Sequence, residues 1–309
     1  MPIDHFQAQR FGRLELLAKQ AVEGFITGLH KSPYHGFSVE FAEHQAYNTG
    51  ESTRHIDWKL YGRTDKMFVK RFEEETNLRC QICIDQSGSM FYPKVENDKS
   101  LNKVRFSIQA SAALIYLMRS QRDAVGVSLF SDGLEWSSPV KSSSVHHNFL
   151  FNQLEELYDK TEGSGHSNII ESLHAIAEKV HKRSLVVIFS DFLDELYRDG
   201  SDQTKLFEAL QHLRYNKHEV VLFHVFDKRT EVDLDLGNQP HTFIDMETGE
   251  KVKVRPNEVK QSYHQERRRM IDEVKLKCRQ FNIDWIETDI SEGFKRVLDR
   301  FLAKRARMV

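Results

Sequence analysis

Residues 185–189, Leu-Val-Val-Ile-Phe, are the segment that most restricts the folds available to this chain. Five consecutive apolar residues leave a strand without a polar face, so other parts of the protein must cover both of its sides. Strands of this kind occur in parallel sheets that carry helices on both faces. The run therefore predicts a central strand of a parallel sheet.

Strands alternate with helices on both sides of this run. The predicted strands, rich in apolar and β-branched residues, are residues 78–84, 125–130, 134–136, 185–189, 219–226 and 283–287. The predicted helices are residues 101–121, 145–158, 169–181, 203–215 and 258–281, and a last helix from residue 291. This alternation predicts an α/β protein with a doubly wound, mostly parallel sheet.

The N-terminal part of the chain does not follow this alternation. It contains a predicted amphipathic helix at residues 11–29 and two extended segments at 37–47 and 67–72. We therefore predict two parts: residues 1–76 as an N-terminal helix with a β-rich accessory region, and residues 77–309 as the α/β domain.

A hairpin is predicted at residues 241–255, inserted in the α/β domain. Two short β segments flank the turn sequence Glu-Thr-Gly-Glu there. A two-stranded ribbon is only marginally stable in water, because it cannot bury its apolar face. We therefore expect the hairpin to pack with the N-terminal strands at 37–47 and 67–72.

Charge and hydropathy narrow the functional classes. Lys and Arg number 44 against 46 Asp and Glu, a balance that argues against a wide surface for nucleic acid or anionic membrane. The longest apolar runs, such as residues 112–118, fall well short of the roughly 20 residues that a membrane-spanning helix needs. Residues 1–13 have no apolar signal core, and three Cys do not make a disulfide framework. These features predict a cytoplasmic protein.

Cys80 and Cys83 form a C-x-x-C pair within the predicted strand 78–84. Residues three apart on a strand face opposite sides, so the two sulfur atoms should diverge. A redox pair favours a helix start and a zinc site needs further ligands. The pair is interpreted as small apolar residues of a core strand.

Polar residues follow two of the predicted strands directly. Asp85, Ser87 and Ser89 come after strand 78–84, Asp191 comes after residues 185–189, and Ser167 precedes the helix that leads into that run. The carboxyl ends of parallel strands share one edge of the sheet, so these oxygen atoms should meet, with Gly88 permitting a sharp turn. Two carboxylates and three hydroxyls are an oxygen set suited to Mg²⁺, with Mn²⁺ or Ca²⁺ as alternatives.

The sequence Asp85-x-Ser87-x-Ser89 resembles the metal-ion-dependent adhesion site of von Willebrand factor A-type domains. That site also uses a hydroxyl residue at the start of a later helix and an Asp at the end of a central strand. Ser167 matches the position usually held by Thr, and Asp191 matches the last Asp. The resemblance implies a sheet of von Willebrand A, Rossmann-like type and a metal held by these five residues.

Residues flanking this motif resemble the domain-of-unknown-function 58 family. The matching segments are Gly50-x-x-x-Arg54-x-Ile56-Asp57-Trp58, Gly62-Arg63 and the hairpin sequence Phe-Ile-Asp-x-Glu-Thr-Gly-Glu at residues 243–250. Many relatives carry N-terminal membrane helices, which are absent here. The resemblance implies that the protein works together with a partner protein, a MoxR-type AAA+ ATPase.

Arg54, Asp57, Trp58 and Arg63 have two interpretations. They can form an internal polar network between the accessory region and the sheet, or a docking surface for a partner. The sequence does not decide between them.

A basic stretch lies in the predicted helix 258–281. Arg267, Arg268, Arg269, Lys275 and Lys277 are interleaved with acidic residues. This pattern favours a solvated helix face over nucleic-acid contact.

Enzyme signatures are incomplete. A phosphoryl-transfer site with Asp85 as nucleophile needs a second carboxylate at the position of Ser87, and neither G-x-S-x-G nor a P-loop occurs. We therefore expect a non-enzymatic, divalent-cation-dependent protein-binding module. A metal-dependent phosphatase or nuclease using Asp85 and Asp191 is the alternative.

Overall fold

The computed structural model describes residues 12–29, 44–46, 58–65, 67–70, 78–95, 100–163, 168–192, 200–246 and 249–305. The chain divides into two compact units. Met1–Phe25 and Leu78–Val309 form the first, and Ile26–Asn77 form the second.

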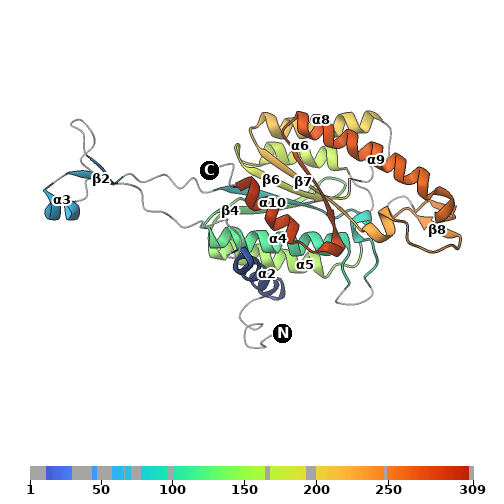
Figure 1. Cartoon of the computed structure of the whole chain (residues 1–309), viewed down its shortest axis with the longest axis horizontal. Coiled ribbons are helices and arrows are strands. Elements are labelled where there is room, and N and C mark those ends of the chain that lie inside the picture. The colour runs from blue at the N-terminus through green and yellow to red at the C-terminus, as the bar shows by residue number, and fades with distance from the viewer. Residues whose placement is uncertain are drawn as a thin grey trace. The chain divides into compact units, whose positions relative to one another are not determined.

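The first unit is built on a six-stranded sheet (Figure 1). Its strands in chain order are β3 (Arg79–Asp85), β4 (Ala124–Phe130), β5 (Leu134–Ser137), β6 (Leu185–Ser190), β7 (Glu219–Phe226) and β10 (Asp284–Asp289). Their spatial order is β10-β7-β6-β3-β4-β5, and every neighbouring pair is parallel except β4 with β5. The predicted α/β fold with a mostly parallel sheet is confirmed.

The strand order reverses between β3 and β6. From β3 the chain first adds β4 and β5 on one side, and it then returns to add β6, β7 and β10 on the other side. Crevices at the carboxyl ends of strands beside such a reversal are where α/β proteins place ligands. This topology identifies the ends of β3 and β6 as the place to look for a site.

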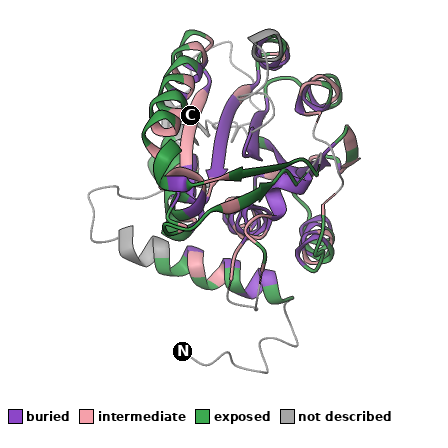
Figure 2. Cartoon of the chain, turned by 90° about the vertical axis from the view of Figure 1, so that its right-hand side faces the viewer, coloured by how far each residue is buried: buried purple, intermediate pink, exposed green. Residues whose placement is uncertain are grey.

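Helices cover both faces of the sheet. Figure 1 shows α6, α8 and α9 on one face and α4, α5 and α10 on the other. Their bounds are α4 (Lys103–Ser120), α5 (Ser144–Tyr158), α6 (Ile169–Lys179), α8 (Gly200–Tyr215), α9 (Pro256–Gln280) and α10 (Lys295–Arg305). Figure 2 shows buried strands at the centre, with the exposed sides of these helices turned outward.

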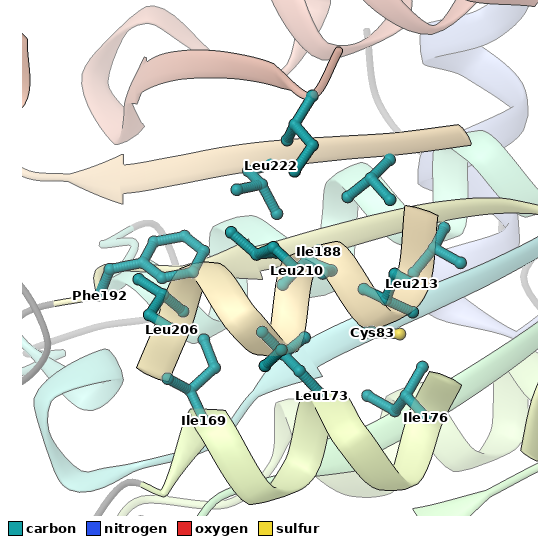
Figure 3. Packing of buried hydrophobic residues seen from close by; sticks show 14 of the residues in the cluster. Cys83, Ile169, Leu173, Ile176, Ile188, Phe192, Leu206, Leu210, Leu213 and Leu222 are labelled. Atoms are coloured by element: carbon teal, nitrogen blue, oxygen red, sulfur yellow. The ribbon is translucent and has the colours of Figure 1, made fainter. Parts of the chain in front are cut away.

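Strand β6 is buried along its whole length, as its apolar sequence predicts. Ile188 of β6 and Leu222 of β7 pack against Leu173 of α6 and Leu210 of α8, within the core on one face (Figure 3). Cys83 belongs to the same core, and Cys80 is equally buried. Burial raises the pKa of both thiols, so the interpretation of this pair as core residues agrees with the structure.

Helix α2 (Arg13–Leu29) was predicted as part of the accessory region, but its residues up to Phe25 belong to the first unit. Its side chains of Leu14, Leu16, Ala18 and Val22 are buried. The backbone N–H of Leu14 donates to Glu155 Oε1 of α5 at 3.0 Å, and Arg119 of α4 pairs with Glu15 at 2.6 Å. Burial of this apolar stripe explains why the helix belongs with the α/β domain.

Two further pairs of strands form separate two-stranded sheets. In the second unit, β1 (His44–Ala46) pairs with β2 (Phe68–Lys70), and α3 (Trp58–Thr64) lies between the two strands in the sequence. In the first unit, β8 (His241–Ile244) and β9 (Lys251–Val254) form the predicted hairpin. Packing of this hairpin with the N-terminal strands stays a prediction.

Within the described residues, no helix is both long and apolar enough to cross a membrane.

Candidate metal centre

Asp85 is the last residue of β3 and is buried. Its Oδ1 accepts a hydrogen bond from the backbone N–H of Ser87 at 2.9 Å, and its Oδ2 accepts one from the Ser190 hydroxyl at 2.6 Å. Ser190 is the last residue of β6, the strand beside β3. The two strand ends at the topological reversal are therefore joined through the Asp85 carboxylate.

Ser87 and Ser89 lie in the turn that follows β3. Gly88 begins the short 3-10 helix η2 (Gly88–Phe91), and the hydroxyl oxygens of Ser87 and Ser89 are 3.2 Å apart. Both side chains are buried. Gly88 does not adopt a positive φ. The turn is made by ordinary helical backbone, so it does not require the conformational freedom of glycine that the sequence suggested.

Gly163 packs against this turn from the loop after α5. A Cβ atom at this position would lie 2.7 Å from the Ser87 carbonyl oxygen and 2.8 Å from that of Gln86. Such distances are far below van der Waals contact, so only glycine lets the two backbones approach this closely. No sequence pattern indicates that Gly163 supports the Asp85 turn.

Asp191 follows β6 and is buried beside a lysine that the sequence analysis missed. Lys103 Nζ lies 2.6 Å from Asp191 Oδ2 and 2.6 Å from Glu231 Oε1. Lys103 is the first residue of α4 and its side chain is fully buried, while Glu231 lies in the turn η3 (Lys228–Val232) after β7. The sequence contained an indication that Lys103 is buried, since this lysine begins a helix whose other residues are mainly apolar or small.

The cluster Asp85, Asp191, Lys103 and Glu231 contains three carboxyl groups and one ammonium. Burial and the negative charge of Asp191 raise the pKa of Asp85 to about 7, although hydrogen bonds from Ser190 and Ser87 oppose the shift. Burial also raises the pKa of Glu231, against the effect of Lys103. Burial lowers the pKa of Lys103, but the carboxylates of Asp191 and Glu231 outweigh it and raise the pKa overall. A further positive charge would relieve the repulsion between Asp85 and Asp191.

The donor set fits a hard cation. Asp85, Asp191, Ser87 and Ser89 supply carboxylate and hydroxyl oxygens, the ligands that Mg²⁺ and Ca²⁺ prefer. Among the described residues, no group of three or more His, Cys, Asp or Glu side chains is arranged to hold a metal. The set at the ends of β3 and β6 has two such side chains and hydroxyl oxygens for the rest.

The remaining predicted residues are placed only in part. Ser167 lies outside the described residues, as do Arg54 and Asp57. Trp58 is the first residue of α3, and Arg63 is exposed near the end of that helix.

Comparison with known proteins places the chain among uncharacterised relatives. Residues 43–272 match the sequence family described as "Protein of unknown function DUF58". "Uncharacterized protein Rv1480" of Mycobacterium tuberculosis is 23% identical over 226 residues, covering 73% of this chain and 67% of the relative. "Uncharacterized protein Mb1516" of Mycobacterium bovis matches to the same extent.

Solved structures give remote similarities. The "conserved hypothetical protein BatB" of Bacteroides thetaiotaomicron is 14% identical, with a TM-score of 0.42 over 74% of this chain and 99% of that protein. An "aerotolerance-related membrane protein" of Bacteroides fragilis is 16% identical, with a TM-score of 0.42 over 74% and 99% of the two chains.

Proposed function

This chain belongs to the DUF58 family, and from that premise we propose that it is a protein-binding module that uses a divalent cation at the ends of β3 and β6. Asp85, Ser87, Ser89 and Asp191 are the proposed ligands among the described residues, and Ser167 is the fifth. Mg²⁺ is the proposed ion, with Mn²⁺ or Ca²⁺ as alternatives. The finer fold assignment, a von Willebrand A-type domain with a metal-ion-dependent adhesion site, is part of this proposal.

The juxtaposition of Asp85 and Asp191 across the topological reversal carries the proposal. Both carboxylates are buried, and the negative charge of Asp191 is a cause of the raised Asp85 pKa. The Ser87 and Ser89 hydroxyls lie in the turn directly after Asp85. A cation at this point would have oxygen ligands from two strand ends, as the D-x-S-x-S motif requires.

The same ligand set favours binding over catalysis. Two carboxylates offset only the charge of a divalent ion and the hydroxyls add none, so the bound ion can still accept an anionic oxygen from outside. Position 87 holds a hydroxyl where a phosphoryl-transfer enzyme of this type needs a general acid. An acidic side chain of a partner protein is the ligand that we propose for the open position.

We propose a MoxR-type AAA+ ATPase as the partner, because the resemblance to the DUF58 family implies one. The chain would then act as an adaptor in the assembly or remodelling of other proteins. Because the partner uses ATP, we propose that the complex works in the cytoplasm.

Titration calorimetry with Mg²⁺, Mn²⁺ and Ca²⁺ tests the metal site. Wild type should give a binding heat that is absent from the Asp85→Ala/Asp191→Ala double variant. Asp132→Ala is a matched control, because Asp132 is an exposed carboxylate in the turn after the neighbouring strand β4. Identical heats from wild type and the double variant would refute the site.

Binding of the purified ATPase tests the partner. The complex should require Mg²⁺, dissociate in EDTA, and weaken in Asp85→Ala but not in Asp132→Ala. Trp58→Ala tests the accessory region as the alternative contact surface. Full binding of the ATPase in EDTA, together with loss of binding in Trp58→Ala, would show that the accessory region makes the contact and the metal does not.

A metal-dependent phosphatase or nuclease using Asp85 and Asp191 is the second candidate, and Lys103 is the observation that favours it. An ammonium beside the strand-end carboxylate of Asp191 would stabilise the charge of a transferring phosphoryl group. Turnover of p-nitrophenyl phosphate that is lost in Asp85→Asn would select this candidate over the binding module.

A further inference from the structure

A cleft of about 500 Å³ lies between α9, β10 and the turn η3. The titratable side chains that line it are His264, Arg267, Arg268, Asp272, Lys275 and Glu287. The volume falls within the range of roughly 300–1,000 Å³ that is usual for small-ligand sites. Neither the metal centre nor the proposed partner contact uses these residues.

Arg267 is the most informative residue of this cleft. Its side chain is only 13% exposed, so the predicted solvated position is wrong for this residue, whereas Arg269 is 74% exposed as expected. Among the described residues, the nearest carboxylate oxygen is Glu287 Oε1, which is 3.9 Å away and beyond hydrogen-bond distance. The guanidinium also lies over the Phe226 ring, 5.1 Å from its centroid.

No described residue accepts a hydrogen bond from the Arg267 guanidinium. Arginine carries five N–H donors, and leaving such donors unmatched in a partly desolvated position costs free energy. Glu287 cannot compensate fully, because it also pairs with Lys275. An acceptor that enters the cleft would satisfy these donors.

Two neighbouring side chains add donors to the same cleft. His264 Nε2 is shielded from solvent and has no hydrogen-bond partner within the described part of the chain. Arg268 lines the cleft and is exposed, and it forms no ion pair with any described residue. Asp272 and Glu287 are the opposing charges of the cleft, and the exposure of Asp272 to water weakens its effect.

The positive field extends into the protein at this edge of the sheet. The His224 side chain is buried at the end of β7, and its imidazole stacks on the Trp285 ring. Burial lowers the pKa of His224 well below its ordinary value, and the charges of Arg267, Lys103 and Lys275 lower it further. The charges of Arg267 and Lys275 therefore act on a group inside the domain.

We propose that this cleft binds the phosphate or diphosphate group of a small ligand through Arg267, Arg268, Lys275 and His264. Paired guanidinium groups present forks of N–H donors that match phosphate oxygens, and the three cations of the cleft outnumber its two carboxylates. The site is separate from the Asp85 cluster and adds a second binding activity to the domain.

Titration calorimetry with pyrophosphate tests the site on the full chain, in buffer containing EDTA so that no divalent cation contributes. Wild type should bind, and Arg268→Gln should weaken binding by about tenfold or more, the effect expected for loss of a charge-assisted hydrogen bond. Arg269→Gln removes the same charge from the next residue of α9, which does not line the cleft, and should bind as wild type does. Asp272→Asn should bind more tightly, because it removes a negative charge from the lining.

Three results would overturn the proposal. The first is the absence of a pyrophosphate heat in wild type. The second is equal weakening in Arg268→Gln and Arg269→Gln, which would reflect diffuse charge instead of a site. The third is binding of malonate as tight as that of pyrophosphate, which would refute the preference for phosphate.

Discussion

The Nζ atom of Lys103 lies 2.6 Å from Oδ2 of Asp191, and both side chains are buried. The ion pair connects the first turn of α4 to the residue that follows the central strand β6. It joins the predicted metal ligand Asp191 to a cation supplied by the protein, and Glu231 binds the same ammonium. The contact therefore bears on both the stability of the domain and the charge of the candidate metal centre.

Lys103→Met should destabilise the protein strongly. Removing one member of a buried ion pair costs about 3–5 kcal/mol, because the remaining charges lose their partner in a desolvated position. Urea denaturation in EDTA measures the free energy of unfolding. Lys182→Met, at an exposed position, should change it by less than about 0.5 kcal/mol. Similar small effects of both substitutions would show that the Lys103 ion pair contributes little.

Asp85 should make the metal-free protein less stable as the pH rises. The pKa of this carboxyl is about 7 in the folded protein against an ordinary value of 3.8. Between these two values the folded protein retains a proton that the unfolded chain has released, so the free energy of unfolding falls with increasing pH. The decrease should be on the order of a few kcal/mol.

Asp85→Asn cannot ionise and should remove this part of the pH dependence. Urea denaturation of wild type and variant in EDTA, at pH 4 and pH 8, measures the difference. The stability of the variant relative to wild type should increase from the lower to the higher pH. Asp132→Asn should follow wild type, because its side chain is exposed. Parallel profiles for wild type and Asp85→Asn would contradict the prediction.

Gly163→Ala should disturb the metal centre without touching any proposed ligand. The added methyl group would meet the backbone carbonyl oxygens of Ser87 and Gln86, so the Asp85 turn would have to move. We expect weaker Mg²⁺ binding in calorimetry and a loss of about 1–3 kcal/mol of stability, as for other overpacked sites. Gly133→Ala has open space around the new methyl group and should leave both quantities near wild type. Unchanged Mg²⁺ affinity in Gly163→Ala would show that the turn tolerates displacement.

Leu14→Ala tests whether α2 is part of the α/β domain. Leu14 is 1% exposed, and truncation of a buried leucine typically costs about 2–5 kcal/mol. Leu17 on the same helix is 36% exposed, so Leu17→Ala should cost much less. Thermal unfolding of both variants gives the comparison. Equal and small shifts in the midpoint would mean that α2 does not contribute to the stability of the domain.

The basic segment of α9 illustrates the limit of charge patterns. Arg267 and Arg269 stand two residues apart in one interleaved run, yet the first is largely buried over Phe226 and the second is exposed. Composition could not distinguish them, because the position of the turn η3 and of β10 decides which arginine faces the cleft.

The amino-acid sequence determined the layers of the domain and the edge at which to search. The apolar run at 185–189 requires cover on both faces, and strands alternating with helices then leave a parallel sheet as the consistent solution. Parallel strands end at one edge, so the positions of Asp85 and Asp191 directly after two strands predicted their proximity. These features are local in sequence, and local rules suffice for them.

Only the tertiary structure revealed the partners of those two carboxylates. Lys103, Glu231 and Ser190 come from α4, η3 and β6, and Gly163 comes from the loop after α5. Each contact depends on how far a helix or loop extends over the sheet edge, which is set by packing among distant segments and not by spacing along the chain. Burial then gives these contacts their strength, because charges removed from water act on one another with little screening.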